Sequence, residues 1–304
     1  MLPFPLNGST ILSQFHFQGG FLLIQADFSG KVAVVTGGSG VLCSEFCKAL
    51  AKSGAKVAVI GSRKESAAPV VEAIRSDGGE AIAIGCNVLD KDSIIAAEQE
   101  IFDTYGQYHI LINGAGIAPA EACTSMEQVT MDMVDFSIEQ GRTLFNMSSD
   151  MFSKVVDVNL KAMFNVTQVF SKRMAGVEGA NILNISSMSG ISPLTKQVAY
   201  SASKAAVANF TRWLATYLAG VGIRVNAIAP GFFLTNINRH LLTNEDGSYA
   251  PRAQKIVNGT PMNRFGAPEE LVGAMLYLCD SSSSGFVTGV ELAVDGGFSA
   301  YCGV

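Results

Sequence analysis

Residues 32–43 read VAVVTGGSGVLC, an apolar run that enters a glycine-rich turn and then a helix-like pattern. A short apolar run without polar alternation is typical of a strand buried on both faces of a sheet. The glycines that follow let backbone N–H groups approach a phosphate at a helix N-terminus. Cys43 stands where the usual dinucleotide-binding turn has its third glycine. The stretch therefore predicts a strand, a turn and a helix that together favour a phosphate-bearing ligand.

The same alternation of apolar runs and helix-period segments continues along the chain, with segments such as Glu45–Lys52 and Ala68–Ser76 between the runs. Strands that alternate with helices predict a parallel sheet, and right-handed crossovers make it doubly wound. The expected fold class is α/β: a Rossmann-type doubly wound parallel seven-stranded sheet with helices on both faces, in a single domain. The six further runs are Val57–Ile60, Ala81–Cys86, Ile110–Asn113, Asn181–Ser186, Arg224–Ala229 and Val290–Val294.

The composition excludes several classes of protein. The 304 residues carry a net charge of −5, so the chain lacks the basic stripe of a nucleic-acid-binding protein and the polybasic anchor of a membrane-surface protein. Hydrophobic residues make up 48% and charged residues 15%, which excludes a disordered chain. The low charge suggests hidden surface, for instance in an oligomer interface. The sequence has no run of about 20 apolar residues, so we expect no membrane span.

The cysteines and histidines do not form a metal-binding pattern. No CxxC pair occurs, and a long chain with few cysteines gives no disulfide framework. Cys43 and Cys47 lie four residues apart on an expected helix, and we interpret them as small core residues. We expect no metal ion and a reducing, cytoplasmic location. The cysteines stand at positions 43, 47, 86, 123, 279 and 302, and the histidines at 16, 109 and 240.

Two segments depart from the strand–helix rhythm. Residues 1–26 are apolar, but no Lys or Arg precedes Lys31, so they do not resemble a secretory signal. We interpret them as a leader that lies over the domain or frays. The second segment, 117–153, is an insertion in the 45 residues between Asn113 and Asn159. It follows a strand end, where α/β sheets bind ligands, so we expect the wall or lid of a substrate pocket. A surface insertion that packs on itself is the alternative.

Two strand ends carry further signals for a dinucleotide. The second expected strand ends in Gly61-Ser62-Arg63-Lys64, with no acidic residue to bind the ribose 2′-hydroxyl of NAD. Ser62 and Arg63 are suited to a 2′-phosphate, which favours NADP over NAD; a solvated basic turn that tolerates NAD is the alternative. The fourth strand ends in Asn113-Gly114-Ala115-Gly116, whose glycines allow a flat or sugar-like ligand to come close. Taken alone, this motif fits an ordinary tight turn better.

The strongest signal for chemistry is a serine, a tyrosine and a lysine. Ser187 ends the fifth expected strand, and Tyr200 and Lys204 follow at i and i+4 of a helix, so both project from one helix face. An ammonium group beside a phenol favours the phenolate and lowers its pKa. A hydroxyl at a strand end can bond the oxygen of a substrate.

In this combination the chain resembles a short-chain dehydrogenase/reductase of the single-domain branch. The resemblance covers residues 27–304 and implies an NAD(P)-dependent oxidoreductase that reduces a ketone or oxidises a secondary alcohol by hydride transfer. The matching motifs, in the family's order, are Thr36-Gly37, Asn87-Val88, Asn113-Gly114-Ala115-Gly116, Asn159, Ser187, Tyr200, Lys204, Pro230-Gly231 and Val294-Asp295-Gly296-Gly297.

The resemblance implies a role for each site residue. Tyr200 is the general acid in reduction and the base in oxidation, Lys204 holds the nicotinamide ribose and lowers the pKa of Tyr200, and Ser187 positions the reacting oxygen. Asn159 holds a water that links Lys204 to solvent. Further residues lie along the pyrophosphate, beside the adenine and over the nicotinamide. The implied cofactor-binding set is Gly37, Ser39, Leu42, Ser62, Arg63, Asn87, Val88, Asn113, Ala115, Gly116, Tyr200, Lys204, Pro230, Gly231, Phe233 and Thr235.

The sequence departs from the family pattern at the phosphate turn and beside the adenine. Read as TGxxxGxG, the turn has Val41 and Cys43 in place of glycines; read as TGxxGxxG, only Cys43 differs. Asn87 stands where the family usually has aspartate. The insertion and the segments Ser192–Lys196, Ala229–Asn236 and Gly297–Tyr301 are similar to the D-mannonate oxidoreductase (fructuronate reductase) type within the family. That similarity implies interconversion of D-fructuronate and D-mannonate.

A hexuronate carries a carboxylate, which needs cations or N–H donors in the pocket. Candidates are Arg239, then Lys196, then Arg142, with a plain surface charge as the alternative for each. Other substrates stay open: a gluconate-type sugar acid, or an apolar ketone or ketoacyl group favoured by the Met- and Phe-rich insertion. The complete Ser–Tyr–Lys set disfavours a non-catalytic dinucleotide sensor, and no GxSxG frame supports a hydrolase.

Overall fold

The computed structural model describes residues 16–18, 21–23, 26–235, 242–244 and 246–303. Most of the expected leader, and the candidate Arg239, lie outside these residues. Within the leader the structure describes one antiparallel pair of strands, β1 (His16–Gln18) and β2 (Phe21–Leu23).

The remaining strands form one seven-stranded sheet with the order β5-β4-β3-β6-β7-β8-β9, and every neighbouring pair is parallel. The predicted sheet is confirmed, and the expected strand ends differ from the observed ones by one residue at most. The runs form strands because both faces are covered: every residue of β3, β6 and β7 is buried. The strands are β3 (Val32–Thr36), β4 (Lys56–Gly61), β5 (Glu80–Gly85), β6 (Ile110–Asn113), β7 (Asn181–Ile185), β8 (Arg224–Pro230) and β9 (Glu291–Val294).

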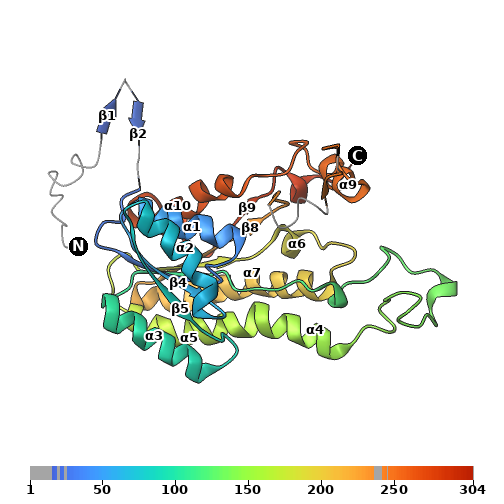
Figure 1. The fold of residues 1–304 in the computed structure, drawn as a ribbon, viewed down its shortest axis with the longest axis horizontal. Coiled ribbons are helices and arrows are strands. Elements are labelled where there is room, and N and C mark those ends of the chain that lie inside the picture. The colour runs from blue at the N-terminus through green and yellow to red at the C-terminus, as the bar shows by residue number, and fades with distance from the viewer. Residues whose placement is uncertain (1–15, 19–20, 24–25, 236–241, 245, 304) are drawn as a thin grey trace, which may run out of the picture.

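Helices cover both faces of the sheet (Figure 1). The apolar sides of α1, α2 and α10 pack into one core layer, and those of α3, α5 and α7 pack into the other. Cys43 and Cys47 are buried in the first layer, as their spacing predicted. The helices are α1 (Val41–Lys52), α2 (Lys64–Ser76), α3 (Lys91–Tyr105), α4 (Ser149–Val156), α5 (Ala162–Met174), α6 (Met188–Ile191), α7 (Val198–Leu218), α9 (Pro251–Asn258), α10 (Val272–Cys279) and α11 (Ser281–Ser284).

The strand order reverses between β3 and β6, which are neighbours in the sheet although β4 and β5 lie between them in the chain. At such a switch point the loops after the two strands leave in opposite directions and open a crevice at the carboxyl edge of the sheet. The glycine turn after β3 and the Asn113–Gly116 loop after β6 therefore meet at this edge.

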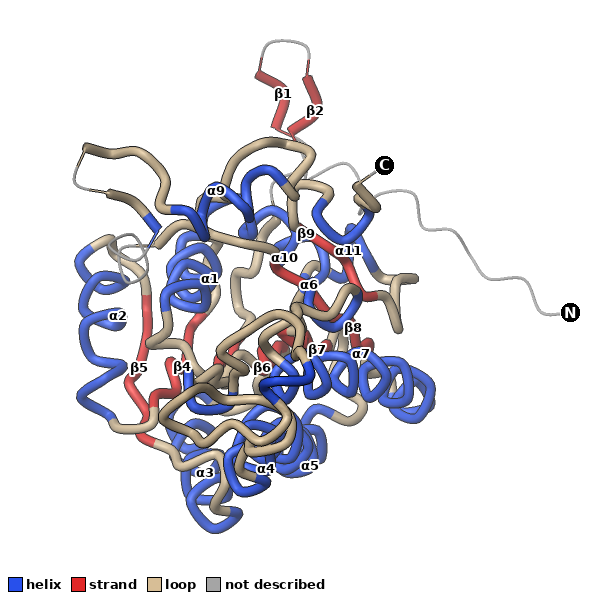
Figure 2. The backbone as a smooth tube through the Cα atoms, turned by 90° about the vertical axis from the view of Figure 1, so that its right-hand side faces the viewer, coloured by secondary structure: helices blue, strands red, loops and turns tan. Residues whose placement is uncertain are grey.

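The insertion extends beyond the carboxyl edge of the sheet as a long loop (Figures 1 and 2). Its only regular structure is two 3-10 turns, Ala120–Ala122 and Met131–Met133, and α4 begins at Ser149, so the loop ends before the expected residue 153. Hydrogen bonds within the loop hold its shape: the Asn146 amide donates to Phe136 O at 2.8 Å and to Gly141 O at 2.9 Å. The loop thus packs on itself, and it also reaches the candidate site described below.

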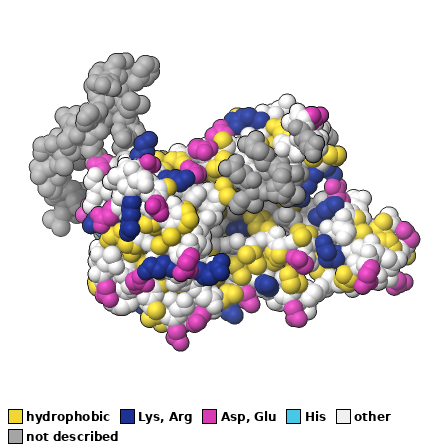
Figure 3. All heavy atoms as spheres, in the orientation of Figure 1, with side chains coloured by type: hydrophobic (Ala, Val, Ile, Leu, Met, Phe, Trp, Pro, Cys, Tyr) yellow, Lys and Arg dark blue, Asp and Glu magenta, His cyan; other side chains and the backbone are white. Residues whose placement is uncertain are grey.

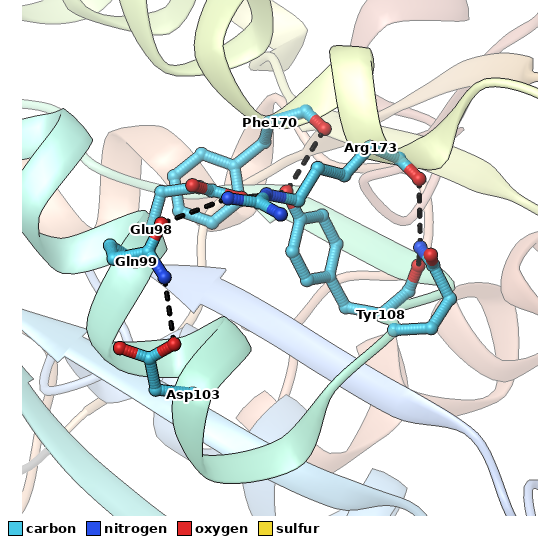
Figure 4. Close-up of polar contacts among 7 residues, drawn as sticks. Glu98, Gln99, Asp103, Tyr108, Phe170 and Arg173 are labelled. Atoms are coloured by element: carbon cyan, nitrogen blue, oxygen red, sulfur yellow. Dashed lines mark hydrogen bonds and ion pairs between the residues drawn. The ribbon is translucent and has the colours of Figure 1, made fainter.

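Away from the carboxyl edge, a buried charge ties α3 to α5 (Figure 4). The Glu98 carboxylate accepts hydrogen bonds from the Tyr108 hydroxyl at 2.7 Å and from Arg173 Nε at 2.6 Å. The Arg173 guanidinium also lies 3.9 Å from the centre of the Phe102 ring. Burial raises the pKa of the Tyr108 phenol, so the hydroxyl stays a donor to Glu98.

We expect Tyr108→Phe to lower the free energy of unfolding by about 2 kcal/mol, because it removes a buried hydrogen bond to a carboxylate. Tyr105→Phe is the matched control: among the described residues the Tyr105 hydroxyl is buried without a hydrogen-bond partner, so its removal should change stability by less than about 0.5 kcal/mol. Urea unfolding of the two variants measures the difference. Equal losses would contradict the assigned role of the Glu98 cluster.

Candidate active site

Helix α7 places Tyr200 and Lys204 at the carboxyl end of β7. Lys204 is buried, and its Nζ donates a hydrogen bond of 2.6 Å to Ile185 O, the last residue of that strand. The same Nζ lies 5.7 Å from the centre of the Tyr200 ring. Gly190 makes the close packing possible, because a Cβ there would come within 2.8 Å of the Lys204 backbone. The ammonium group and the phenol therefore occupy one corner of the site.

Ser187 follows β7 directly and caps the short helix α6. Its Oγ accepts hydrogen bonds from Ser189 N at 3.2 Å and from Ser189 Oγ at 3.1 Å. Burial raises the pKa of Tyr200, and a hydrogen bond with Ser187 lowers it in part. The serine and tyrosine hydroxyls therefore meet, as a pair that binds one substrate oxygen must.

Burial also acts on Lys204, because removing an ammonium group from water disfavours its charged form. It lowers the pKa of Lys204 from 10.5 to about 8. The lysine is therefore protonated at neutral pH and loses its charge in mildly alkaline solution. A buried group that titrates this close to neutrality is typical of a functional site.

Asn159 lies in a π-helical turn, Asp157–Lys161, that interrupts the run from α4 to α5. Its Oδ1 accepts from Ile117 N at 2.7 Å, and its Nδ2 donates to Ile117 O at 3.1 Å and to Ser203 Oγ at 3.0 Å. One amide thus joins the loop after β6 to α7, beside Lys204. Single π turns in α-helices occur frequently at functional sites.

The turn after β3 fits a dinucleotide pyrophosphate. Gly37 has a φ of +64°, and a Cβ there would come within 2.8 Å of Ala115 N. Helix α1 begins directly after Gly40, without a side-chain cap, so its first amide N–H groups are available to a phosphate. Ser39 and Leu42, the other predicted pyrophosphate residues, are exposed and half-buried at this turn.

Cys43 fits this turn because Gly114 leaves room for it. A Cβ on Gly114 would meet the Cys43 Sγ and would also lie 2.8 Å from Thr36 O. Burial raises the pKa of the Cys43 thiol to about 12, and the nearby Lys204 charge lowers it in part. The thiol is therefore a neutral filler between the turn and the loop after β6.

The predicted adenine-side residues lie at the ends of β4 and β5. Ser62 and Arg63 are exposed at the start of α2, where a phosphate also benefits from the helix dipole. The Asn87 side chain accepts a hydrogen bond from Leu89 N at 3.1 Å, and Val88 beside it is half-buried. Ser62, Arg63 and Asn87 are therefore exposed where the resemblance implies an adenosine group.

Asn113 differs in orientation from the rest of the predicted cofactor residues. Its side chain points into the core and donates to Thr167 Oγ1 at 3.0 Å and to Asn184 Oδ1 at 2.9 Å. Only the backbone of Asn113, with Ala115 and Gly116 after it, faces the carboxyl edge. A Cβ on Gly116 would lie 3.7 Å from Lys204 Nζ, so this loop borders the lysine.

The loop after β8 closes another side of the site. Gly231 N donates to Val294 O at 3.0 Å, and a Cβ on Gly231 would come within 2.6 Å of Asp295. Pro230 and Phe233 are buried, Thr235 is half-buried, and Phe233 forms an isolated bridge with Gly266. The loop is therefore fixed to the end of β9 and the segment that follows α9.

Two of the three predicted substrate residues come together at the insertion. Lys196 Nζ donates to Ser125 O at 2.8 Å, and Arg142 Nε donates to Cys123 O at 3.0 Å. Arg239, the first candidate, lies outside the described residues. Arg252 and Lys255 on α9 were not among the predicted site residues, although Lys255 pairs with Glu127 of the insertion at 2.6 Å. Their only signal was an amphipathic helix that begins with proline.

Within the described parts of the chain, no group of three or more His, Cys, Asp or Glu side chains is arranged to hold a metal ion. None of the described helices is long and apolar enough to cross a membrane.

Comparisons with known proteins agree with this geometry. The sequence profile described as short chain dehydrogenase matches residues 31–246. An uncharacterised oxidoreductase of Bacillus subtilis, UxuB, is 46% identical over 92% of this chain and 99% of its own length.

Solved structures give the same result. A Haemophilus influenzae protein, provisionally assigned as a D-mannonate oxidoreductase and solved with bound NAD, is 45% identical with a TM-score of 0.86, covering 91% of this chain and 98% of that one. A gluconate 5-dehydrogenase from Burkholderia cenocepacia, solved with NADP and tartrate, is 28% identical with a TM-score of 0.74, covering 91% and 98%. The chain therefore belongs to the short-chain dehydrogenase family and is an NAD(P)-dependent oxidoreductase.

Proposed function

We propose that the enzyme interconverts D-fructuronate and D-mannonate. The observation that carries the proposal is the position of two cations, Arg142 in the insertion and Lys196 before α7. The segment that Lys196 and Arg142 hold, Cys123–Ser125, follows Ala122, which packs in one apolar cluster with Tyr200. A substrate ketone at Tyr200 then places an acidic group at the other end of the sugar chain near positive charge. The resemblance to the D-mannonate oxidoreductase type adds support.

Each residue of the site has a defined task in this reaction. The Tyr200 hydroxyl donates its proton to the carbonyl oxygen in reduction and takes it back in oxidation, and the Ser187 hydroxyl bonds the same oxygen. The dinucleotide, when bound, supplies the hydride for reduction and accepts it in oxidation. Lys204 bonds the nicotinamide ribose and favours the phenolate of Tyr200 by its charge. Asn159 orients the loop at Ile117 and holds a water molecule through which protons pass between solvent and Lys204.

NADP is the preferred cofactor in this proposal, and NAD is accepted less well. This preference is supported by the end of β4, where Ser62 and Arg63 are exposed and no acidic residue is present to bind the ribose 2′-hydroxyl of NAD. A cytoplasmic location belongs to the same proposal. All six cysteines are free thiols in the structure, which suits a reducing compartment.

The first test follows absorbance at 340 nm with D-fructuronate and either NADPH or NADH. We expect turnover with both cofactors and a higher kcat/KM with NADPH. Tyr200→Phe should abolish turnover while the variant still binds the dinucleotide, because it removes the proton donor and leaves the glycine turn intact. No turnover of D-fructuronate by the unaltered enzyme would overturn the proposed substrate, and faster turnover with NADH would overturn the cofactor preference.

The pH profile of reduction tests Lys204. Its depressed pKa means that the charge is present below pH 8 and lost above it, whereas the raised pKa of Tyr200 keeps the phenol protonated. We therefore expect kcat/KM for reduction to fall as pH rises through about 8. In Lys204→Arg, whose guanidinium stays charged, the fall should move to higher pH. An unchanged profile would assign the titration to another group.

A specific observation favours each of two other substrate classes. A gluconate-type sugar acid would use the same cations, and the Burkholderia relative carries that assignment. An apolar ketone or ketoacyl group is favoured by the exposed apolar side chains of the insertion, Met131, Leu144 and Phe145. A substrate panel in the same assay separates these classes.

We further propose that the enzyme is a homotetramer or homodimer, with one interface on α4, α5 and α7. Hydrophobic side chains gather over α4 and the start of α5 (Figure 3). A shallow hollow there is lined by Leu160, Phe164, Phe210 and Trp213, among others. The Trp213 side chain is half exposed and stacks on Tyr217 at 4.7 Å. A stacked aromatic face of this kind is typical of a protein interface.

The double variant Phe164→Glu/Trp213→Glu should lower the molar mass in solution, because two charges would be buried without partners at that interface. Ile95→Glu on α3 is the control, since Ile95 is an exposed apolar residue on another surface. Size-exclusion chromatography with light scattering measures the mass. A monomeric wild type, or an unchanged mass in the double variant, would contradict the proposed interface.

A further inference from the structure

One short stretch of the insertion, residues 123–127, is held from two sides of the site. On one side, Thr124 N donates to Lys196 O at 2.9 Å, and Lys196 Nζ donates to Ser125 O at 2.8 Å. On the other side, Lys255 of α9 pairs with both carboxylate oxygens of Glu127 at 2.6 Å. The stretch therefore bridges the segment before α7 and helix α9.

The bridge determines which face of α9 meets the insertion. Arg252 and Lys255 are three residues apart on the helix, so their side chains lie on the same face. Because Lys255 reaches Glu127, Arg252 one turn earlier also faces the insertion. Burial raises the pKa of the Cys123 thiol, and the positive charges of Arg142 and Arg252 both lower it. The charges of Arg142 and Arg252 therefore both act on the Cys123 thiol.

The same stretch lies next to the reacting hydroxyl. Ala122, the neighbour of Cys123, is buried in one apolar cluster with Ala199, and Tyr200 packs against that cluster. Arg142 is fixed at this point, since its Nε donates to Cys123 O at 3.0 Å and its backbone N donates to Ser125 Oγ at 3.0 Å. The Arg142 guanidinium is thus held at a stretch that adjoins the apolar cluster on which Tyr200 packs.

The charges at this place do not cancel. Glu127 neutralises Lys255, but in the part of the chain that the structure describes, Arg142, Lys196 and Arg252 form no ion pair within 4.0 Å. The acidic residue that acts on Cys123 is Glu121, and it raises the thiol pKa less than burial does. Figure 3 shows Lys and Arg side chains gathered where the insertion meets the lobe that carries α9. An excess of guanidinium groups beside a substrate space suits an anion.

We propose that Arg252 and Arg142 form a two-guanidinium site for the carboxylate of a sugar-acid substrate, and that the Glu127–Lys255 pair fixes α9 so that Arg252 reaches it. This inference rests on the proposed function and names the residues that select an acid over a neutral sugar. Guanidinium groups bind carboxylates through paired, charge-assisted hydrogen bonds, which a single lysine does not reproduce. A neutral sugar of the same length gains nothing from the pair.

The test compares Arg252→Gln and Arg142→Gln with two matched substrates. D-Fructose has the carbon chain of D-fructuronate with a hydroxymethyl group in place of the carboxylate. Each variant should lose about tenfold to a hundredfold in kcat/KM for D-fructuronate, while kcat/KM for D-fructose stays unchanged. The control Lys52→Gln removes an exposed cation from the end of α1 and should alter neither value. Loss confined to the acid identifies recognition of the carboxylate rather than a damaged fold.

Binding gives a second readout that does not need turnover. In the presence of NADP⁺, the dissociation constant of D-mannonate should rise by a similar factor in Arg252→Gln, and that of neutral D-mannitol should stay the same. A kcat/KM for D-fructuronate within twofold of wild type in Arg252→Gln would overturn the role of Arg252. An equal loss for the acid and the neutral sugar would also overturn it.

Failure of the proposed substrate is a separate outcome. If the wild type does not turn over D-fructuronate, its thermal stabilisation by D-mannonate, D-gluconate and tartrate is measured beside Arg252→Gln. Stabilisation that depends on Arg252 supports the carboxylate site and assigns the enzyme another sugar acid. Absence of stabilisation by any of these acids in the wild type would overturn the site itself.

Discussion

The hydrogen bond from Lys204 Nζ to Ile185 O fixes the geometry on which the rest of the site depends. It inserts a charged side chain into the carboxyl end of the sheet, where an ammonium group is costly to bury. The cost is tolerated because a carbonyl at the end of β7 accepts the bond, and because Gly190 and Gly116 leave room beside the lysine. With α7 held in this way, Tyr200 has one available position. The lowered pKa of Lys204 is the electrostatic consequence of the same burial.

Sequence patterns predicted the fold well because buried parallel strands produce a simple hydrophobic pattern in the sequence. Each strand of the sheet is a short apolar run, and at least one helix lies between each run and the next. The Ser187–Tyr200–Lys204 set could also be predicted from the sequence, since helical periodicity alone puts Tyr200 and Lys204 on one helix face. The role of Asn113 was harder to predict. Its place in a glycine-rich motif suggested that its side chain contacts the cofactor, yet that side chain bonds Thr167 and Asn184 in the core. A one-dimensional motif does not distinguish a side chain that faces a ligand from one that supports the loop.

The shape of the insertion could not be predicted from sequence patterns. Its shape depends on hydrogen bonds between residues far apart in sequence, such as Lys196 with Ser125, and no periodic pattern encodes them. The amphipathic pattern around Arg252 did not point to a ligand, because a cation on an amphipathic helix is ordinarily a solvated charge. Its significance comes only from the pairing of Lys255 with Glu127, which are 128 residues apart. The phosphate turn shows the opposite case: the unexpected Cys43 is explained by one nearby glycine in the folded chain.

The Glu127–Lys255 pair makes the contact between the insertion and α9 sensitive to the salt concentration of the solution. Both side chains remain largely exposed, so dissolved ions screen their attraction, over a Debye length of about 8 Å at physiological ionic strength. The contact between the insertion and α9 is therefore weaker in concentrated salt, whereas the buried bond of Lys204 is not affected in this way. The docking of the insertion on α9 thus responds to the ionic strength of the solution, and the position of Lys204 does not.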